Sequence, residues 1–97
     1  MSLKKGNMEK QLFEEQENAF YQRLGRALRL ERIGQGLTQS DAGKAANCTF
    51  QQIQKYEKGS NKPGEFRVRL LVESLYKKPY DQFLKEYNVY PCRTENQ

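Results

Sequence analysis

The sequence contains no histidine, no tryptophan and only two cysteines among its 97 residues. Without histidine or a cysteine cluster we expect no metal site, because zinc sites in proteins are built largely from these ligands. Two distant cysteines are too few for a disulfide scaffold, so reduced thiols and a cytoplasmic location are expected. No general base or nucleophile is recognisable, and the sequence predicts no catalytic residue, no cofactor and no enzyme.

Long apolar runs are also missing. No segment is long and apolar enough to span a membrane or to act as a secretory signal, so we expect no membrane partner. The hydrophobic fraction of 36% and the charged fraction of 30% predict one small domain with a compact core. Seventeen lysines and arginines against twelve acidic residues give a net charge of +5. This balance favours an anionic partner such as nucleic acid.

Residues 38–59 have the pattern of two short helices joined by a tight turn. Thr38 is suited to cap the first of them, with Asp41 in the position of a capping-box partner. Asn47 tolerates the left-handed conformation that closes a helix. Thr49 can cap the second helix, and Gly59 can end it.

Helical periodicity predicts further helices on both sides of this stretch. The first helix is expected over residues 19–33, with a core face of Phe20, Leu24, Ala27 and Leu28. A fourth helix follows a turn-rich loop and is expected to bury Phe66, Leu70, Leu71 and Leu75, with Val68 or Val72 at the margin. A fifth helix begins at Pro79. Its apolar residues are expected to face the core or a partner; they are Tyr80, Phe83, Leu84 and Tyr87. The predicted fold is therefore all-α, a compact bundle of about five short helices.

The predicted domain covers residues 19–88. It lies between a polar N-terminal extension, residues 1–18, which is expected to be partly disordered or helical, and a C-terminal tail, residues 89–97. Residues 9–18 are rich in glutamate and glutamine, with Leu12 and Phe13 among them. They extend the first helix, or they form a separate turn that packs Phe13 on the domain or on a partner.

Arginines recur along one side of the first helix. Arg23, Arg26, Arg29 and Arg32 are each three residues apart. They form a solvated face, or one or two of them reach phosphates or a partner. Glu31 is a candidate for an ion pair with one of them.

Several groups of residues follow one another at characteristic spacing. They are Leu28-Arg29-Leu30-Glu31-Arg32, Gly36-Leu37-Thr38-Gln39, Thr49 with Ile53, Tyr56-Glu57-Lys58-Gly59, and Lys62-Pro63. In this order, the set resembles the helix-turn-helix of the phage-repressor-like (lambda-repressor-like, Xre-type) DNA-binding family, over roughly residues 24–84. The family usually has Leu, Ala and Gly where this chain has Ala42, Gly43 and Asn47. Gly43 keeps the side chain small where the two helices cross.

The resemblance implies that the third helix lies in the major groove, with its first turn against the bases. Ile53 and Tyr56 are expected to face the core. A glutamine amide matches the adenine edge bidentately, and an apolar ring can contact a thymine methyl group. Solubility alone also explains a glutamine-rich helix, but we predict base readout by Phe50, Gln51, Gln52 and Lys55.

Phosphate contacts are predicted around this helix. The resemblance implies that Gln39 contacts backbone phosphate and supports the first turn of the third helix. The full set of predicted phosphate contacts is Gln39, Thr49, Lys58, Asn61 and Lys62.

The sequence thus indicates a sequence-specific regulator that binds double-stranded DNA, by resemblance a transcriptional repressor. We expect a homodimer on an inverted-repeat operator, with Phe83 and Tyr87 as the self-contact. The alternative is an antitoxin-like or other small protein that binds a protein partner as well as DNA. Its contact would be made by the Phe13 segment or by the tail after Asn88.

Overall fold

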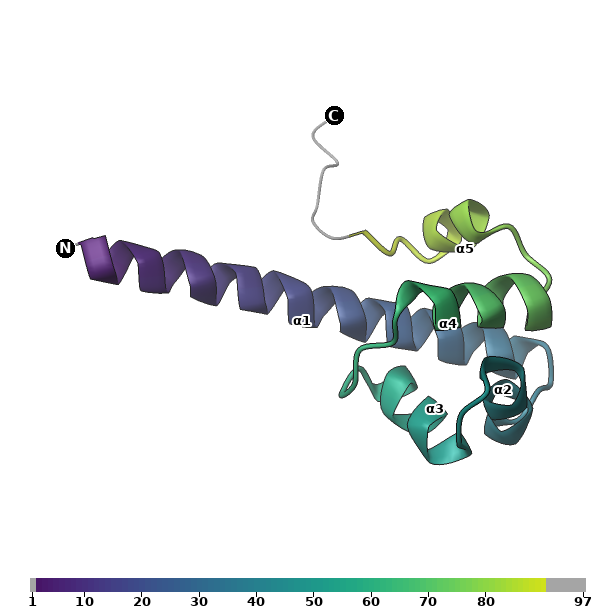
Figure 1. Cartoon of the computed structure of the whole chain (residues 1–97). Helices are drawn as coiled ribbons and strands as arrows, with labels where there is room; N and C mark the ends of the chain where they lie inside the picture. Colours follow the sequence, from purple (N-terminus) through teal and green to yellow (C-terminus); the bar gives the residue numbers. More distant parts are fainter. Residues whose placement is uncertain (1, 91–97) are drawn as a thin grey trace.

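One long helix carries the fold, and shorter helices pack around its C-terminal half (Figure 1). The computed structural model describes residues 2–90, and the side chains of residues 8–90. The elements are α1 (Ser2–Gly34), α2 (Gln39–Ala46), α3 (Phe50–Lys58), α4 (Glu65–Arg69), the π-helical η1 (Leu70–Leu75) that continues α4, and α5 (Tyr80–Glu86). Every regular element of residues 2–90 is a helix, which confirms the all-α prediction.

The helix α1 is much longer than the predicted residues 19–33. Of the two alternatives for residues 9–18, the structure has the helical extension, since α1 begins at Ser2. This half of α1 projects away from the globular part (Figure 1). Leu12 and Phe13 are 57% and 63% exposed, so Phe13 does not pack on the domain. No helix within residues 2–90 combines the length and the apolar character needed to cross a membrane.

The hydrophobic core lies between the C-terminal half of α1 and the other helices. Its buried members are Leu24, Ala27, Leu28, Ala42, Ala46, Ile53, Tyr56, Val68, Leu71, Val72, Tyr76, Phe83 and Val89. The predicted core faces of α1 and α3 are confirmed, with Phe20 only partly buried at the edge. Val89, placed in the predicted tail, is buried, and residues 91–97 of that tail lie outside the described residues.

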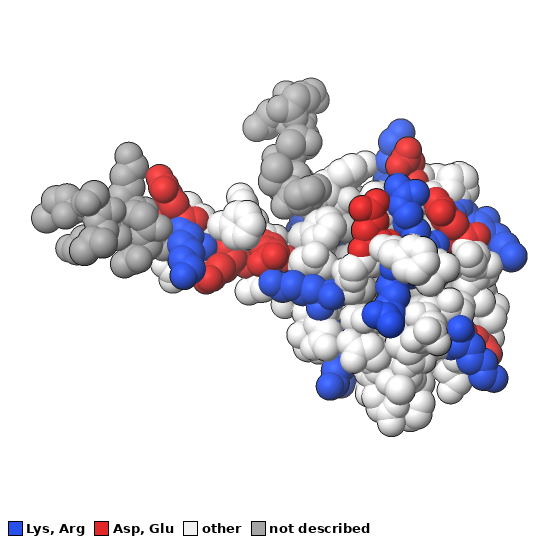
Figure 2. Space-filling model, in the orientation of Figure 1, with Lys and Arg blue, Asp and Glu red and all other residues white. Residues whose placement is uncertain are grey.

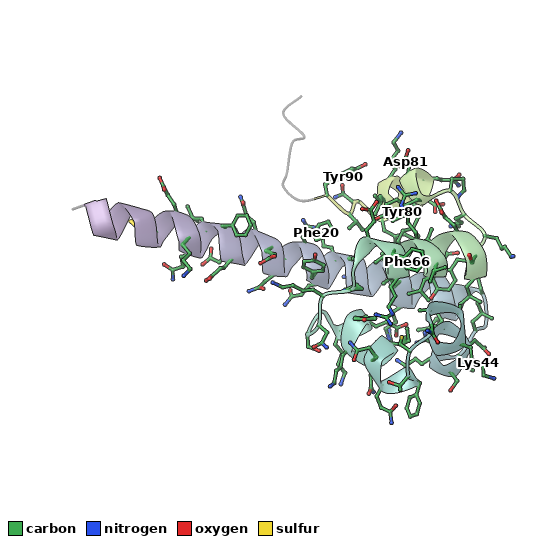
Figure 3. All side chains as sticks on the ribbon, in the orientation of Figure 1. Phe20, Lys44, Phe66, Tyr80, Asp81 and Tyr90 are labelled. Atoms are coloured by element: carbon green, nitrogen blue, oxygen red, sulfur yellow. The ribbon has the colours of Figure 1, made fainter. Side chains whose placement is uncertain are left out.

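The predicted buried stripe of the fourth helix is wrong by part of a turn. Phe66, labelled in Figure 3, is 76% exposed, and Leu70 is only half-buried. Leu71 is buried as predicted, but it shares the centre of the stripe with Val68 and Val72, which were expected only at its margin. These residues also have helical spacing, and the two overlapping stripes cannot be told apart by periodicity alone.

The helix α5 closes the core from one end. Phe83 is completely buried, and its ring centroid lies 5.1 Å from that of Tyr87. The prediction that Phe83 forms a self-contact between two copies is therefore wrong, because the domain's own core occupies this side chain.

Glu31 ties α1 to the C-terminal part of the domain. Its Oε1 accepts hydrogen bonds from Lys78 Nζ at 2.9 Å and Tyr87 Oη at 2.7 Å, and its Oε2 accepts one from Gln35 Nε2 at 2.7 Å. The predicted pairing of Glu31 with an arginine is wrong, since Lys78 is its partner. Burial opposes ionisation of this carboxyl, but the three donors outweigh burial and hold its pKa below the ordinary value.

Replacing this carboxylate should lower stability in a pH-dependent way. The folded-state pKa of Glu31 lies below the ordinary 4.5. Its contribution is therefore complete above that value and is lost as the pH falls through the lowered pKa. We expect Glu31→Gln to cost about 1–3 kcal/mol at neutral pH, and less in acid. Urea unfolding across this pH range measures the difference, with Glu14→Gln, on the projecting half of α1, as control. If the difference in unfolding free energy between wild type and Glu31→Gln stayed constant into acid, Glu31 would not have the lowered pKa assigned to it.

The burial pattern of α3 and α4 gives a second test. Ile53 is 1% exposed, so Ile53→Ala should cost about 2–5 kcal/mol of unfolding free energy. Leu70 is half-buried, and Leu70→Ala should cost only about 1 kcal/mol. Thermal and urea unfolding of the two variants measure the contrast. Equal losses would mean that Leu70 belongs to the core.

Candidate nucleic-acid interface

The helix α2 begins with the predicted capping box. Thr38 Oγ1 accepts a hydrogen bond from Asp41 N at 3.0 Å, and Asp41 Oδ2 accepts one from Thr38 N at 2.8 Å. The bond from the Thr38 backbone stabilises the charged carboxylate and lowers the pKa of Asp41. The start of α2 is thereby fixed at Thr38.

The turn between α2 and α3 leaves no space for larger side chains. Asn47 closes α2 in the left-handed conformation, with φ of 56°. A Cβ atom on Gly43 would lie 2.7 Å from Cys48 O, so glycine lets the turn fold back on α2. Thr49 then caps α3 by accepting a hydrogen bond from Gln52 N at 3.1 Å. These contacts confirm the predicted helix-turn-helix geometry.

The helix α3 has one buried face and one exposed face. The buried residues are Ile53, Tyr56 and Glu57. Phe50 is 48% exposed despite its apolar ring. The other exposed residues of α3 are Gln51, Gln54, Lys55 and Lys58. Three of the four predicted base-reading residues lie on this face, and the fourth, Gln52, is half-buried.

A buried ion pair anchors α3 to α1. Arg32 Nε lies 2.7 Å from Glu57 Oε2, and Arg32 Nη2 donates to Glu57 Oε1 at 3.0 Å. The remaining terminal nitrogen of Arg32 donates to Leu37 O at 2.9 Å. The hydrogen bond with Glu57 raises the pKa of Arg32, so the guanidinium stays charged. Arg32 is thus an internal residue, and its place in the predicted exposed stripe is wrong.

Gln39 joins the same cluster. Its Nε2 donates to Glu57 Oε1 at 3.1 Å, which links the first residue of α2 to the last turn of α3. The predicted support for the first turn of α3 is therefore wrong. Glu57 itself was not predicted as a structural residue of the site. The sequence did contain a signal for this role, because Glu57 directly follows Tyr56, which was expected to face the core.

A cleft of about 520 Å³ opens beside this cluster. It is lined by Arg29, Arg32, Leu37, Thr38, Gln39, Gln54, Glu57 and Lys58. The cleft brings the predicted phosphate contacts Gln39 and Lys58 together with the exposed Arg29. It joins the ends of α1 and α3 to the start of α2, and it includes Gln54 and Lys58 from the exposed face of α3.

Lys62 lies in the loop after α3 and faces α1. Its Nζ is 2.9 Å from Glu17 Oε1 and 5.7 Å from the ring centroid of Tyr21. The Lys62 side chain remains 50% exposed. Asn61, the neighbouring candidate, is half-buried. Neither of these two residues lines the cleft that contains Gln39 and Lys58.

Among the other arginines of α1, Arg23 Nη2 donates to Tyr90 O at 2.8 Å, whereas Arg26 and Arg29 are exposed. Figure 2 shows basic side chains spread around the globular part with acidic ones among them, and side chains of both charges along the projecting helix.

The helices α1 and α3 touch through backbone atoms. A Cβ atom on Gly25 would lie 2.3 Å from Tyr56 O and 2.7 Å from Glu57 O. Any larger residue must therefore push α3 away from α1. Gly25 and the Arg32–Glu57 pair together fix how far the exposed face of α3 stands out from the domain.

Comparison with known proteins gives a family and several relatives. The family model described as helix-turn-helix matches residues 28–79. The "Uncharacterized HTH-type transcriptional regulator y4aM" of Sinorhizobium fredii is 44% identical over 52 residues, which are 54% of this chain and 36% of the relative. Its y4wC counterpart from the same organism is 39% identical over 62 residues, which are 64% of this chain and 43% of the relative. A regulator of the same description from Sinorhizobium medicae is 42% identical over 52 residues, covering 54% of this chain and 37% of the relative.

The chain thus matches only 36% to 43% of the length of these curated relatives. No solved structure matches it significantly.

The close approach at Gly25 can be tested with a matched pair of variants. Alanine in place of glycine usually stabilises a helix by up to about 1 kcal/mol. Gly25→Ala should instead destabilise the domain by about 1–3 kcal/mol, because the new methyl group meets the backbone of α3. Gly34→Ala, where no atom lies within 4 Å of the added Cβ, should be neutral or slightly stabilising. Urea unfolding compares them, and a stabilised Gly25→Ala would contradict the close contact.

Proposed function

Since the chain belongs to the helix-turn-helix family, we propose that it is a repressor-type transcriptional regulator that binds double-stranded DNA sequence-specifically and reads the major groove with α3. Family membership supports DNA binding and regulation over catalysis. The observation that carries the proposal is the two-faced α3, with Ile53, Tyr56 and Glu57 buried while the opposite face is exposed. Such a helix can enter a groove without disturbing the core.

The exposed face of α3 supplies chemistry that suits base edges. Gln51 lies in the first turn and offers both a donor and an acceptor, as the adenine edge requires. Phe50 offers an exposed ring for a thymine methyl group, and Lys55 a donor for guanine. Gln52, being half-buried, contributes from the edge of this surface.

Phosphate contacts would position α3 without reading sequence. We assign this role to the rim of the cleft, through Gln39 and Lys58, and to the ends of α3, through Thr49, Asn61 and Lys62. Lys62 must exchange Glu17 for a phosphate in this process. A partly exposed pair of this kind is worth only about 0.2–1 kcal/mol, so the exchange costs little.

The proposed DNA target is an inverted repeat bound by two copies. One domain of this size covers a single half-site, and paired domains read half-sites about one helical turn apart. Selection of bound DNA from a random library should return a two-fold repeat. Full-affinity, one-to-one binding to a single unrepeated half-site would contradict it.

A second candidate function is a small protein that binds a protein partner as well as DNA. It is supported by Phe13, which is 63% exposed on the projecting half of α1. A stoichiometric protein that co-purifies from the native host would support this candidate. Loss of that protein from a Phe13→Ser variant would assign the contact to this segment.

Two variants separate reading from positioning. Gln51 carries no charge, so Gln51→Ala should cost about 1–3 kcal/mol on the selected site and flatten preference at one base pair per half-site. The salt dependence of binding should hardly change. Lys62→Ala should instead weaken binding to all DNA about equally and reduce the salt slope by about one unit per half-site. Fluorescence anisotropy at several salt concentrations measures both effects.

The same titrations use random DNA as the reference. If Gln51→Ala weakened specific and random DNA equally, α3 would not be the reading element. The exposed arginines of α1 would then be the next surface to test.

A further inference from the structure

Exposed apolar side chains lie on one face of α1 near both ends of the part whose side chains the structure describes. Met8 and Leu12 are 62% and 57% exposed, and Leu30 and Ile33 are 42% and 48% exposed. At about 100° per residue, these four share one face with two charged residues. We call this face the α1 stripe; it consists of Met8, Leu12, Glu15, Arg26, Leu30 and Ile33, with Ala19 and Gln22 at its middle. Phe13 lies about a third of a turn away and is not part of it.

The stripe is symmetric about a point close to Tyr21. Met8 and Ile33 are nearly equidistant from that point, as are Leu12 and Leu30, and Glu15 and Arg26. An identical helix laid antiparallel, with the two midpoints aligned, therefore places apolar residues opposite apolar residues. It also places Glu15 opposite the partner's Arg26, twice in the pair.

The charge along α1 favours this direction. Residues 8–18 contain four glutamates and one lysine, whereas residues 23–30 contain three arginines and no acidic residue. In an antiparallel pair, the acidic half of each helix lies along the basic half of the other. A parallel pair would instead oppose glutamate to glutamate and arginine to arginine, which is unfavourable.

The position of α3 fits the same arrangement. Gly25, whose backbone lies against the last turn of α3, is a little more than a quarter turn from the centre of the α1 stripe. A two-fold axis perpendicular to the plane of two antiparallel α1 helices keeps features at such a position on the same side of that plane. Both α3 helices would then face one DNA duplex, as an inverted repeat requires.

We propose that a second copy of this chain docks antiparallel on the α1 stripe, and that the dimer is held by the two α1 helices and not by α5. Phe83 of α5 is buried in its own core and offers no contact. This dimer deepens the proposed function, but only the argument from the orientation of the two α3 helices rests on that function. Dimer formation is measured without DNA, so the two ideas fail separately.

Charge reversal tests the pairing, and both residues are exposed, so folding should be retained. Glu15→Arg places like charges at both symmetric contacts, and so does Arg26→Glu. Each should raise the dissociation constant of the dimer on the order of 10- to 100-fold in sedimentation equilibrium. The double variant restores opposite charges at both contacts and should return to nearly wild-type dimerisation. An equimolar mixture of the two single variants should form a heterodimer for the same reason.

Glu14→Arg is the matched control. It makes the same charge change one residue away, but on a different face of α1, and should leave the dimer intact. A wild-type chain that remains monomeric at millimolar concentration would overturn the proposal. So would a double variant as weak as the singles, or a Glu14→Arg variant as weak as Glu15→Arg. DNA binding that persists in a strictly monomeric wild type would leave the proposed function standing while the dimer proposal fails.

Discussion

The rest of the interface depends on the buried pair between Arg32 and Glu57. A buried charge is costly unless its partner is present, and here both carboxylate oxygens and all three guanidinium nitrogens are used. The pair also holds Gln39, so a single cluster connects α1, α2 and α3. The orientation of the exposed face of α3 is therefore fixed by the buried face, where Glu57 must pair with Arg32. Gly25 adds a steric limit to this electrostatic one, since the backbones of α1 and α3 are already in contact.

Local chemistry was predictable from the sequence. The capping box at Thr38, the left-handed Asn47 and the stop at Gly59 depend on residues close together in the chain, and all three are present. The side of the fourth helix that faces the core was not predictable. Phe66 and Val68 both start stripes of helical spacing, and only packing against the rest of the domain, chiefly α2, distinguishes them. Periodicity locates helices, but it does not choose between two overlapping apolar faces.

The candidate site shows the same division. The exposure of Gln51 and Lys55 follows from the burial of Ile53, which sequence spacing revealed. The partners of charged residues did not follow, because they are far away in the chain. Lys62 pairs with Glu17, and Glu57 pairs with a side chain that the sequence placed among exposed arginines. The predicted stripe of arginines therefore gave the charge of α1 correctly, but it did not give the role of each arginine.

The length of α1 has a consequence for its dynamics. Every described side chain from Met8 to Gln16 is exposed, so opening this segment uncovers no core surface. From Leu24 onward, opening the helix requires separation from α3 and from the core. Starting a helix is unfavourable, but extending one is not. The projecting half of α1 therefore stays helical because it extends the half that is packed in the core. Amide hydrogen exchange within this one helix should therefore range from rapid fraying near Ser2 to the rate of global unfolding near Leu28.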